Sequence, residues 1–272
     1  MKKFLLSFVA VMVAFSSFAQ RQQRVSVEYK TEENIFYSQN TDAYSLERCV
    51  LDVYYPLGVQ DCPVIVWFHG GGLTSGNKTI PEQLKNRGYV VIAANYRFMN
   101  KVDVRDCIDD AAAAVAWAFN NAAKYGGDPG NIYVSGHSAG GYLTSMIGLD
   151  KKYLAKYGID ADKIAALIPF SGQVMTHYAY RQQHGGSEYV PTIDDTSPIA
   201  HVRADGPPYV IVSGDRELEL YGRYEENAYM WRMMKLIGHE QTFIYELDGY
   251  SHNAMAEPAF YILRQYVKRR VN

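Results

Sequence analysis

The stretch Gly136-His137-Ser138-Ala139-Gly140-Gly141 decides how the rest of the chain is interpreted. A short apolar run, residues 131–135, precedes it, and a helix-like segment, residues 142–147, follows it. A serine between glycines at such a junction is typical of a nucleophile in a sharp strand-to-helix turn, because only small neighbours fit around the strained backbone. A glycine-rich turn without chemistry also matches this short pattern, so its surroundings must decide between the two interpretations.

Strand and helix patterns alternate along the 272 residues. Strands are expected at residues 25–29, 48–55, 63–68, 89–94, 131–135, 164–170, 209–213 and 242–247. Helices are expected at residues 80–87, 104–124, 142–147, 224–237 and 258–269. This alternation predicts an α/β fold, with a mostly parallel central sheet and helices on both of its faces. No linker or repeat interrupts it, so a single domain is expected over residues 20–272.

The first 19 residues have the pattern of a signal peptide. Residues 1–3 include two lysines, residues 4–15 are apolar, and small residues precede an expected cleavage after Ala19. The apolar run is short for a membrane span, and no cysteine follows it to carry a lipid, so no membrane anchor is expected. The mature protein is therefore expected in the periplasm or outside the cell.

Composition argues against nucleic acid as a partner and does not settle whether two of the cysteines are paired. The formal net charge is −2, so no basic surface points to nucleic acid. Cys49, Cys62 and Cys107 are too few for a disulfide scaffold. Cys107 has the helical spacing of a buried thiol. Cys49 and Cys62 lie on neighbouring expected strands, and both a disulfide between them and two reduced thiols remain open.

A second glycine-rich motif, His69-Gly70-Gly71-Gly72, follows the strand expected at residues 63–68. In parallel sheets, sites form at the carboxyl ends of the strands, where the Ser138 motif also lies. Attack by a serine on an ester creates an oxyanion that needs N–H donors. The N–H groups of Gly71, Gly72 and Ala139 are predicted to supply them, and His69 is predicted to shape the loop.

The chain offers seven histidines as the base that a serine nucleophile needs. Position in the sheet separates them. His239 lies in a helix-to-strand connection, at the wrong edge, and His177, His184 and His201 lie in the long connection before residue 209. His252 follows the last strand at the correct edge, so it is predicted to be the general base and acid.

An acid that orients this base is expected after the strand at residues 209–213. Two carboxylates stand there, Asp215 and Glu217. Asp215 lies at the turn itself, where aspartate commonly binds local N–H groups, so Glu217 is favoured and Asp215 is the alternative. Asp248 is a weaker third candidate because Asp-Gly is typical of a turn.

Taken together, these motifs resemble the α/β-hydrolase esterases, in particular the hormone-sensitive-lipase-like and bacterial acetyl- or feruloyl-esterase-like branch. The resemblance extends from about Leu51 to the C-terminus. It implies an acid at the position of Glu217, although aspartate is usual there. Leu73 departs from the family, which often has an aromatic residue at this point. The short segment before residue 48 leaves room only for a small lid, expected at residues 174–195.

The sequence therefore predicts an exported serine carboxylesterase that acts through an acyl-enzyme, with acetyl or feruloyl groups on carbohydrates as candidate substrates. His177, Tyr178, Tyr180 and Arg181 of the lid are predicted to contact the substrate. No metal or cofactor is implied, and a monomer acting on a small-molecule or carbohydrate-linked ester is expected. An amidase or exopeptidase with the same triad is the alternative enzyme, and a non-catalytic binding module is the alternative outside the enzymes.

Overall fold

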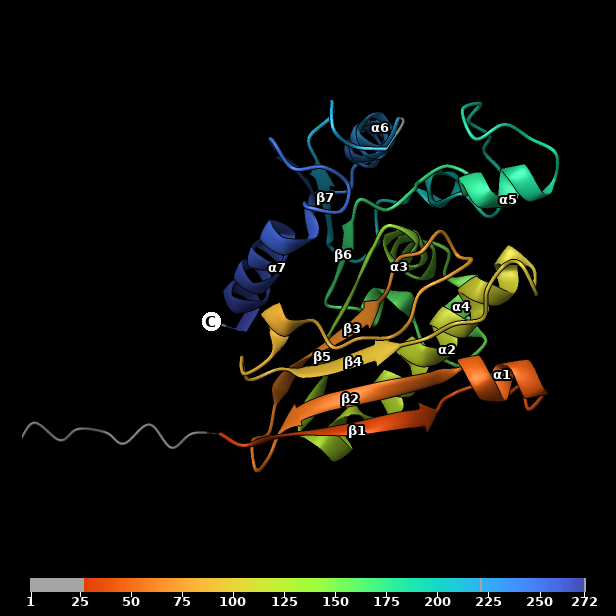
Figure 1. Ribbon diagram of the computed structural model, residues 1–272. Helices are drawn as coiled ribbons and strands as arrows, with labels where there is room; N and C mark the ends of the chain where they lie inside the picture. Colours follow the sequence, from red (N-terminus) through yellow and green to blue (C-terminus); the bar gives the residue numbers. More distant parts are fainter. Residues whose placement is uncertain (1–26, 221, 272) are drawn as a thin grey trace, which may run out of the picture.

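The computed structural model describes residues 27–220 and 222–271, and the predicted leader lies outside them. Its centre is an eight-stranded sheet with the order β1-β2-β4-β3-β5-β6-β7-β8 (Figure 1). The strands from β3 to β8 are parallel, whereas β2 is antiparallel to both β1 and β4. The strands are β1 (Tyr29–Phe36), β2 (Val50–Pro56), β3 (Cys62–Phe68), β4 (Val90–Ala94), β5 (Gly127–His137), β6 (Ala166–Phe170), β7 (Tyr209–Gly214) and β8 (Thr242–Leu247). The predicted α/β fold with a mostly parallel sheet is confirmed.

Helices cover both faces of this sheet. The α-helices are α1 (Ala43–Arg48), α2 (Val104–Asn121), α3 (Ala139–Leu149), α4 (Lys152–Ala155), α5 (Tyr178–Gln183), α6 (Arg223–Leu236) and α7 (Ala256–Val271). The 3-10 helices are η1 (Glu82–Leu84), η2 (Ala122–Tyr125), η3 (Ala161–Lys163) and η4 (Pro198–His201). Among the described residues, no helix combines the length and the apolar character needed to cross a bilayer.

The buried side chains of β3 show how the two faces are filled. Val64, Val66 and Phe68 belong to a core shared with α2, α3 and α6, whereas Ile65 and Trp67 belong to a second core shared with α7. Successive side chains of a strand point to opposite faces, so a strand that is apolar at every position must be covered on both. The helices α3 and α7 lie on opposite sides of the central strands in Figure 1.

Two expected elements differ from the structure. Residues 25 and 26 of the first expected strand lie outside the described residues. The described strand runs over Tyr29–Phe36, because its exposed, polar residues pair along β2 without an apolar pattern that the sequence reveals. The helix expected at residues 80–87 is only the short η1, since the backbone is already extended at Lys85 and has positive φ at Asn86 and Gly88. All three cysteines are buried free thiols, so Cys49 and Cys62 form no disulfide.

Two close backbone contacts fix α3 against the carboxyl edge of the sheet. A Cβ atom on Gly140 would lie 2.1 Å from the carbonyl oxygen of Phe68 at the end of β3. A Cβ atom on Gly141 would lie 2.8 Å from the Cα atom of Gly172, which follows β6. Only glycine permits this approach, and the approach places the start of α3 against the ends of β3 and β6.

We expect Gly140→Ala to lower the free energy of unfolding by about 3 kcal/mol or more, because the new methyl group meets rigid backbone. The measurement is urea unfolding monitored by circular dichroism. Gly158→Ala is the control: its φ is +71° but no atom lies within 4 Å of the new Cβ, so about 1 kcal/mol is expected. Equal losses in both variants would contradict this packing.

Candidate active site

Ser138 occupies the sharp turn between β5 and α3 that the sequence predicts. Its backbone dihedrals are φ 56° and ψ −114°, a combination that L residues rarely adopt. Its N–H donates to the carbonyl oxygen of Phe170, the last residue of β6, at 2.8 Å. Such strain costs about 1–3 kcal/mol and persists only where the surroundings enforce it. The turn therefore holds the serine side chain at the carboxyl edge of the sheet.

His252 lies in the loop after β8 and contacts the serine directly. Its Nε2 atom lies 2.9 Å from Oγ of Ser138. Its backbone carbonyl accepts a hydrogen bond from Nε2 of His137 at 2.8 Å, and the two imidazole rings lie 4.8 Å apart between centroids. Burial lowers the pKa of His137 to about 4, so this neighbour stays neutral at ordinary pH and acts as a fixed donor. The structure brings together the predicted nucleophile and base.

The carboxylate that contacts His252 is Glu219. Its Oε2 atom lies 2.7 Å from Nδ1 of the imidazole, and its Oε1 atom accepts the N–H of Gly214 at 2.9 Å. The Glu219 side chain is fully buried. Burial opposes its ionisation, but the hydrogen bond and charge attraction from His252 outweigh burial and lower the pKa of Glu219 to about 2. Glu219 is therefore an ionised group aimed at the histidine.

The prediction that Glu217 or Asp215 orients His252 is wrong. Asp215 accepts the N–H groups of Glu217 at 2.8 Å and Gly249 at 2.7 Å, so it stabilises the turn. The chain then makes one helical turn, in which the N–H of Glu219 bonds to the carbonyl of Asp215 at 2.8 Å. This turn directs residue 219 inward and leaves Glu217 exposed. Since Glu219 occupies the position of the acid, the third candidate, Asp248, is wrong as well.

Ser171, directly after β6, is a further member of the site that the sequence patterns did not reveal. It is fully buried and has φ 47°. Its Oγ atom lies 3.0 Å from Nδ1 of His252, and its carbonyl oxygen accepts a hydrogen bond from Nη1 of Arg223. Its position at the carboxyl end of a central strand was the available signal. Ser171 and Glu219 together hold one side of the imidazole.

The predicted donor loop lies beside Ser138. A Cβ atom on Gly70 would lie 3.4 Å from Cβ of Ser138, which places the loop next to the nucleophile. Gly71 and Gly72 have φ of 107° and 63°, and the carbonyl of Gly71 accepts N–H groups from the next turn. Among the described residues, no acceptor binds the N–H of Gly71 or Gly72. Ala139 begins α3, where a helix leaves its first N–H groups without an internal partner.

The four predicted lid residues have different surroundings. His177 is 1% exposed and packs against Tyr142, so the prediction that it faces the substrate is wrong. Arg181 donates to the carbonyls of Thr176, Ser187 and Glu188, and these bonds hold the segment together. Tyr178 lies over the glycine loop, since a Cβ atom on Gly72 would lie 2.6 Å from its hydroxyl oxygen.

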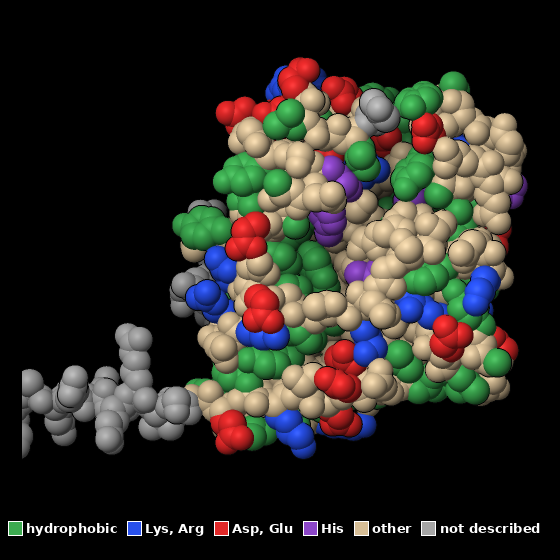
Figure 2. Space-filling model, viewed as in Figure 1, with side chains coloured by type: hydrophobic (Ala, Val, Ile, Leu, Met, Phe, Trp, Pro, Cys, Tyr) green, Lys and Arg blue, Asp and Glu red, His purple; other side chains and the backbone are tan. Residues whose placement is uncertain are grey.

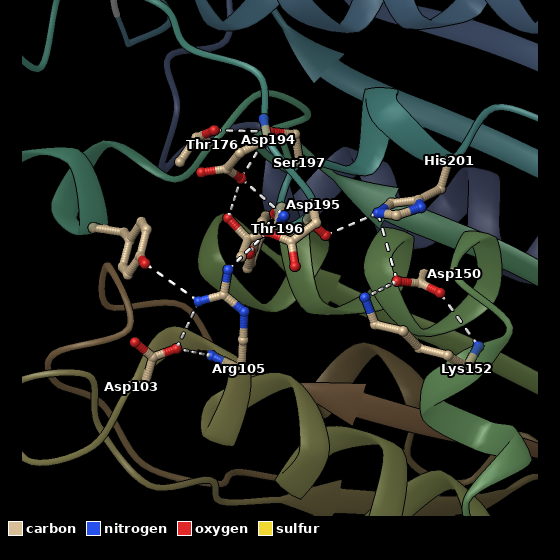
Figure 3. Close-up of polar contacts among 12 residues, drawn as sticks. Asp103, Arg105, Asp150, Lys152, Thr176, Asp194, Asp195, Thr196, Ser197 and His201 are labelled. Carbon is tan, nitrogen blue, oxygen red and sulfur yellow. Dashed lines mark hydrogen bonds and ion pairs between the residues drawn. The ribbon is translucent and has the colours of Figure 1, made fainter.

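Polar contacts connect the end of the predicted lid, residues 174–195, to helix α2 (Figure 3). Arg105 of α2 donates to Asp195 at 2.7 Å and to the hydroxyl of Tyr180 at 3.3 Å. Asp194 accepts the N–H of Thr196 at 2.8 Å. Tyr180 is therefore held by α2, and its predicted contact with substrate has no support in these bonds.

Histidine side chains gather around a hollow near the middle of one face (Figure 2). Within residues 27–220 and 222–271, no group of three or more His, Cys, Asp or Glu side chains has the arrangement of a metal site.

The fold and this arrangement define the class of the protein as an α/β hydrolase. The structure resembles a truncated carbohydrate esterase from gut microbiota, with a TM-score of 0.71, 19% identity and coverage of 90% of this chain and 96% of the other. It also resembles propionate-bound esterase 2 of Thermogutta terrifontis, with a TM-score of 0.67, 24% identity and coverage of 90% and 94%.

The chain belongs to the BD-FAE family, whose model matches residues 51–219. It is 27% identical to the probable carboxylic ester hydrolase LipM of Mycobacterium tuberculosis, over 71% of this chain and 50% of that protein. It is 26% identical to esterase LipC of the same organism, over 75% and 56%. The chain thus spans about half the length of these relatives.

Proposed function

We propose that this protein is a carboxylic ester hydrolase that uses Ser138 as its nucleophile. The observation that carries the proposal is the chain of contacts from Oγ of Ser138 through the imidazole of His252 to the carboxylate of Glu219. Serine, histidine and an acid in this order form the arrangement that acyl transfer requires. Membership of the BD-FAE family and similarity to carboxylic ester hydrolases support the same reaction.

In the proposed mechanism, Ser138 attacks the ester carbonyl while Nε2 of His252 takes the hydroxyl proton. Glu219 accepts the Nδ1–H of the imidazole, which fixes the tautomer that leaves Nε2 free and stabilises the imidazolium that forms. His252 then gives its proton to the leaving alcohol. Water attacks the acyl-enzyme in a second step, with His252 again acting as the base.

The N–H groups of Ala139, Gly71 and Gly72 stabilise the oxyanion. The supporting observations are the unoccupied loop donors beside Ser138 and the position of Ala139 at the start of α3. The dipole of α3 adds partial positive charge at the same place. Donors that are already oriented need no rearrangement as charge develops, so they favour the transition state over the substrate.

We propose that the enzyme is exported and that acetyl or feruloyl groups on carbohydrates are its substrates. Two observations support this: a short segment, rather than a large cap domain, lies between β6 and β7, and a similar structure is described as a carbohydrate esterase. The similar Thermogutta esterase binds propionate, a short acyl group. An amidase would use the same three residues, but the relatives named above are ester hydrolases.

We expect the purified protein to hydrolyse 4-nitrophenyl acetate, acetylated xylo-oligosaccharides or methyl ferulate, and to leave aminoacyl anilides intact. Initial rates on this panel are the measurement. Ser138→Ala is the control and should retain the fold while losing turnover. Faster turnover of the anilides than of every ester would favour an amidase, and no turnover of any compound would favour a binding module.

The acid is tested by three amide substitutions. Glu219→Gln should lower kcat by about 10³- to 10⁴-fold, because the amide no longer stabilises the imidazolium. Glu217→Gln is the matched control and should remain within about threefold of wild type. Asp215→Asn should melt at a lower temperature, with a loss of about 1 kcal/mol, and keep substantial activity. A large loss of kcat in Glu217→Gln together with a small one in Glu219→Gln would refute the assignment.

A further inference from the structure

A pocket of about 220 Å³ adjoins the proposed active site. Its lining residues are Gln173, Tyr178, Glu188, Leu220 and Arg223. Leu220 directly follows Glu219, and Tyr178 lies over Gly72 of the donor loop. The pocket therefore lies between the loop that faces the nucleophile and the segment that carries the acid.

Arg223, the first residue of α6, is an unusual lining residue because it is buried without an ion pair. Arg223 is 3% exposed, and its Nε atom has no hydrogen-bond partner among residues 27–220 and 222–271. Nη1 donates to the carbonyl oxygen of Ser171. Among the described residues, no carboxylate forms an ion pair with its guanidinium. A buried charge without a partner is costly, so this arrangement leaves binding capacity for an anion.

The two nearest carboxylates are committed to other donors. Glu226 accepts hydrogen bonds from Nε2 of Gln173 at 3.2 Å and from the N–H of Val174 at 3.1 Å. Glu219 accepts hydrogen bonds from Nδ1 of His252 and from the N–H of Gly214. Burial lowers the pKa of Arg223, whereas both carboxylates stabilise its positive charge at a distance. The guanidinium therefore keeps N–H donors that no carboxylate in the described part of the chain uses.

Arg181 shows that a buried arginine does not always keep unused N–H donors. It is 7% exposed and also lacks an ion pair within the described part of the chain, but its Nε, Nη1 and Nη2 atoms all donate to main-chain carbonyls. Tyr178 lines the Arg223 pocket together with Gln173 and Leu220. Glu188 at the rim is partly exposed and accepts a hydrogen bond from Gln182, so solvent screens its charge.

We propose that the Arg223 pocket binds a carboxylate carried by the ester substrate, on either its acyl or its alcohol part. This inference rests on the proposed esterase function and adds a preference for anionic esters. Arginine binds a carboxylate through charge-assisted hydrogen bonds, and Arg223 is a cationic group that lines this pocket. The bound carboxylate then lies beside the ester group that reacts and takes no part in the reaction itself.

The test compares matched anionic and neutral esters. The acyl arm uses the mono-4-nitrophenyl ester of glutarate and the same ester with its free carboxylate converted to an amide. The alcohol arm uses acetylated galacturonate and acetylated galactose. The measurement is the ratio of kcat/KM for each anionic ester to that for its neutral partner, after subtraction of uncatalysed hydrolysis.

We expect wild type to prefer the anionic member of at least one pair, and Arg223→Gln to lower that ratio by about 10- to 100-fold. Arg223→Lys keeps the charge without the paired donors, so it should lose less. Arg87→Gln, which removes an exposed arginine between η1 and β4, is the control and should change the ratio by less than about twofold. The arm that responds identifies which part of the substrate carries the carboxylate.

No anionic preference in wild type, or equal losses on both members of a pair in Arg223→Gln, would overturn the proposal. The second result would mean that Arg223 acts only through Ser171. Calorimetry of glutarate and of galacturonate with Ser138→Ala separates this proposal from the esterase function. Binding that disappears on adding Arg223→Gln supports the pocket even if no ester is hydrolysed, and absence of binding by both glutarate and galacturonate contradicts the proposal.

Discussion

The strained turn at Ser138 is the constraint on which the rest of the site depends. A serine with φ 56° is unfavourable by itself, so the surrounding structure must enforce it. The hydrogen bond from its N–H to Phe170 and the close approach of Gly140 to Phe68 provide that enforcement. Both contacts involve neighbouring parallel strands, so the sheet itself fixes the direction of the serine side chain.

The histidine depends on the same edge of the sheet, but through residues from different strands. Glu219 follows β7, Ser171 follows β6 and His137 ends β5, and each contacts His252. Together with Ser138 at Nε2, these contacts hold His252 at both ring nitrogens and at its backbone carbonyl. The geometry of the base is therefore a property of several strand ends rather than of one motif.

The sequence predicted the parts of this arrangement that follow from strand order. Apolar runs located β3 to β7, and position after a strand located Ser138 and His252. It did not predict Glu219, because a single helical turn decides whether residue 217 or 219 faces inward, and no apolar periodicity marks so short a turn. It also predicted that His177 faces the substrate, whereas aromatic packing buries that residue.

The most direct test of the account is covalent labelling with an organophosphonate ester probe, followed by intact mass and peptide mapping. We expect one added phosphonyl group, located on Ser138, and no adduct in Ser138→Ala. Slow labelling of Glu219→Gln under the same conditions is also expected, because the base would then lack its acid. Stoichiometric labelling that persists in Ser138→Ala would contradict the central claim.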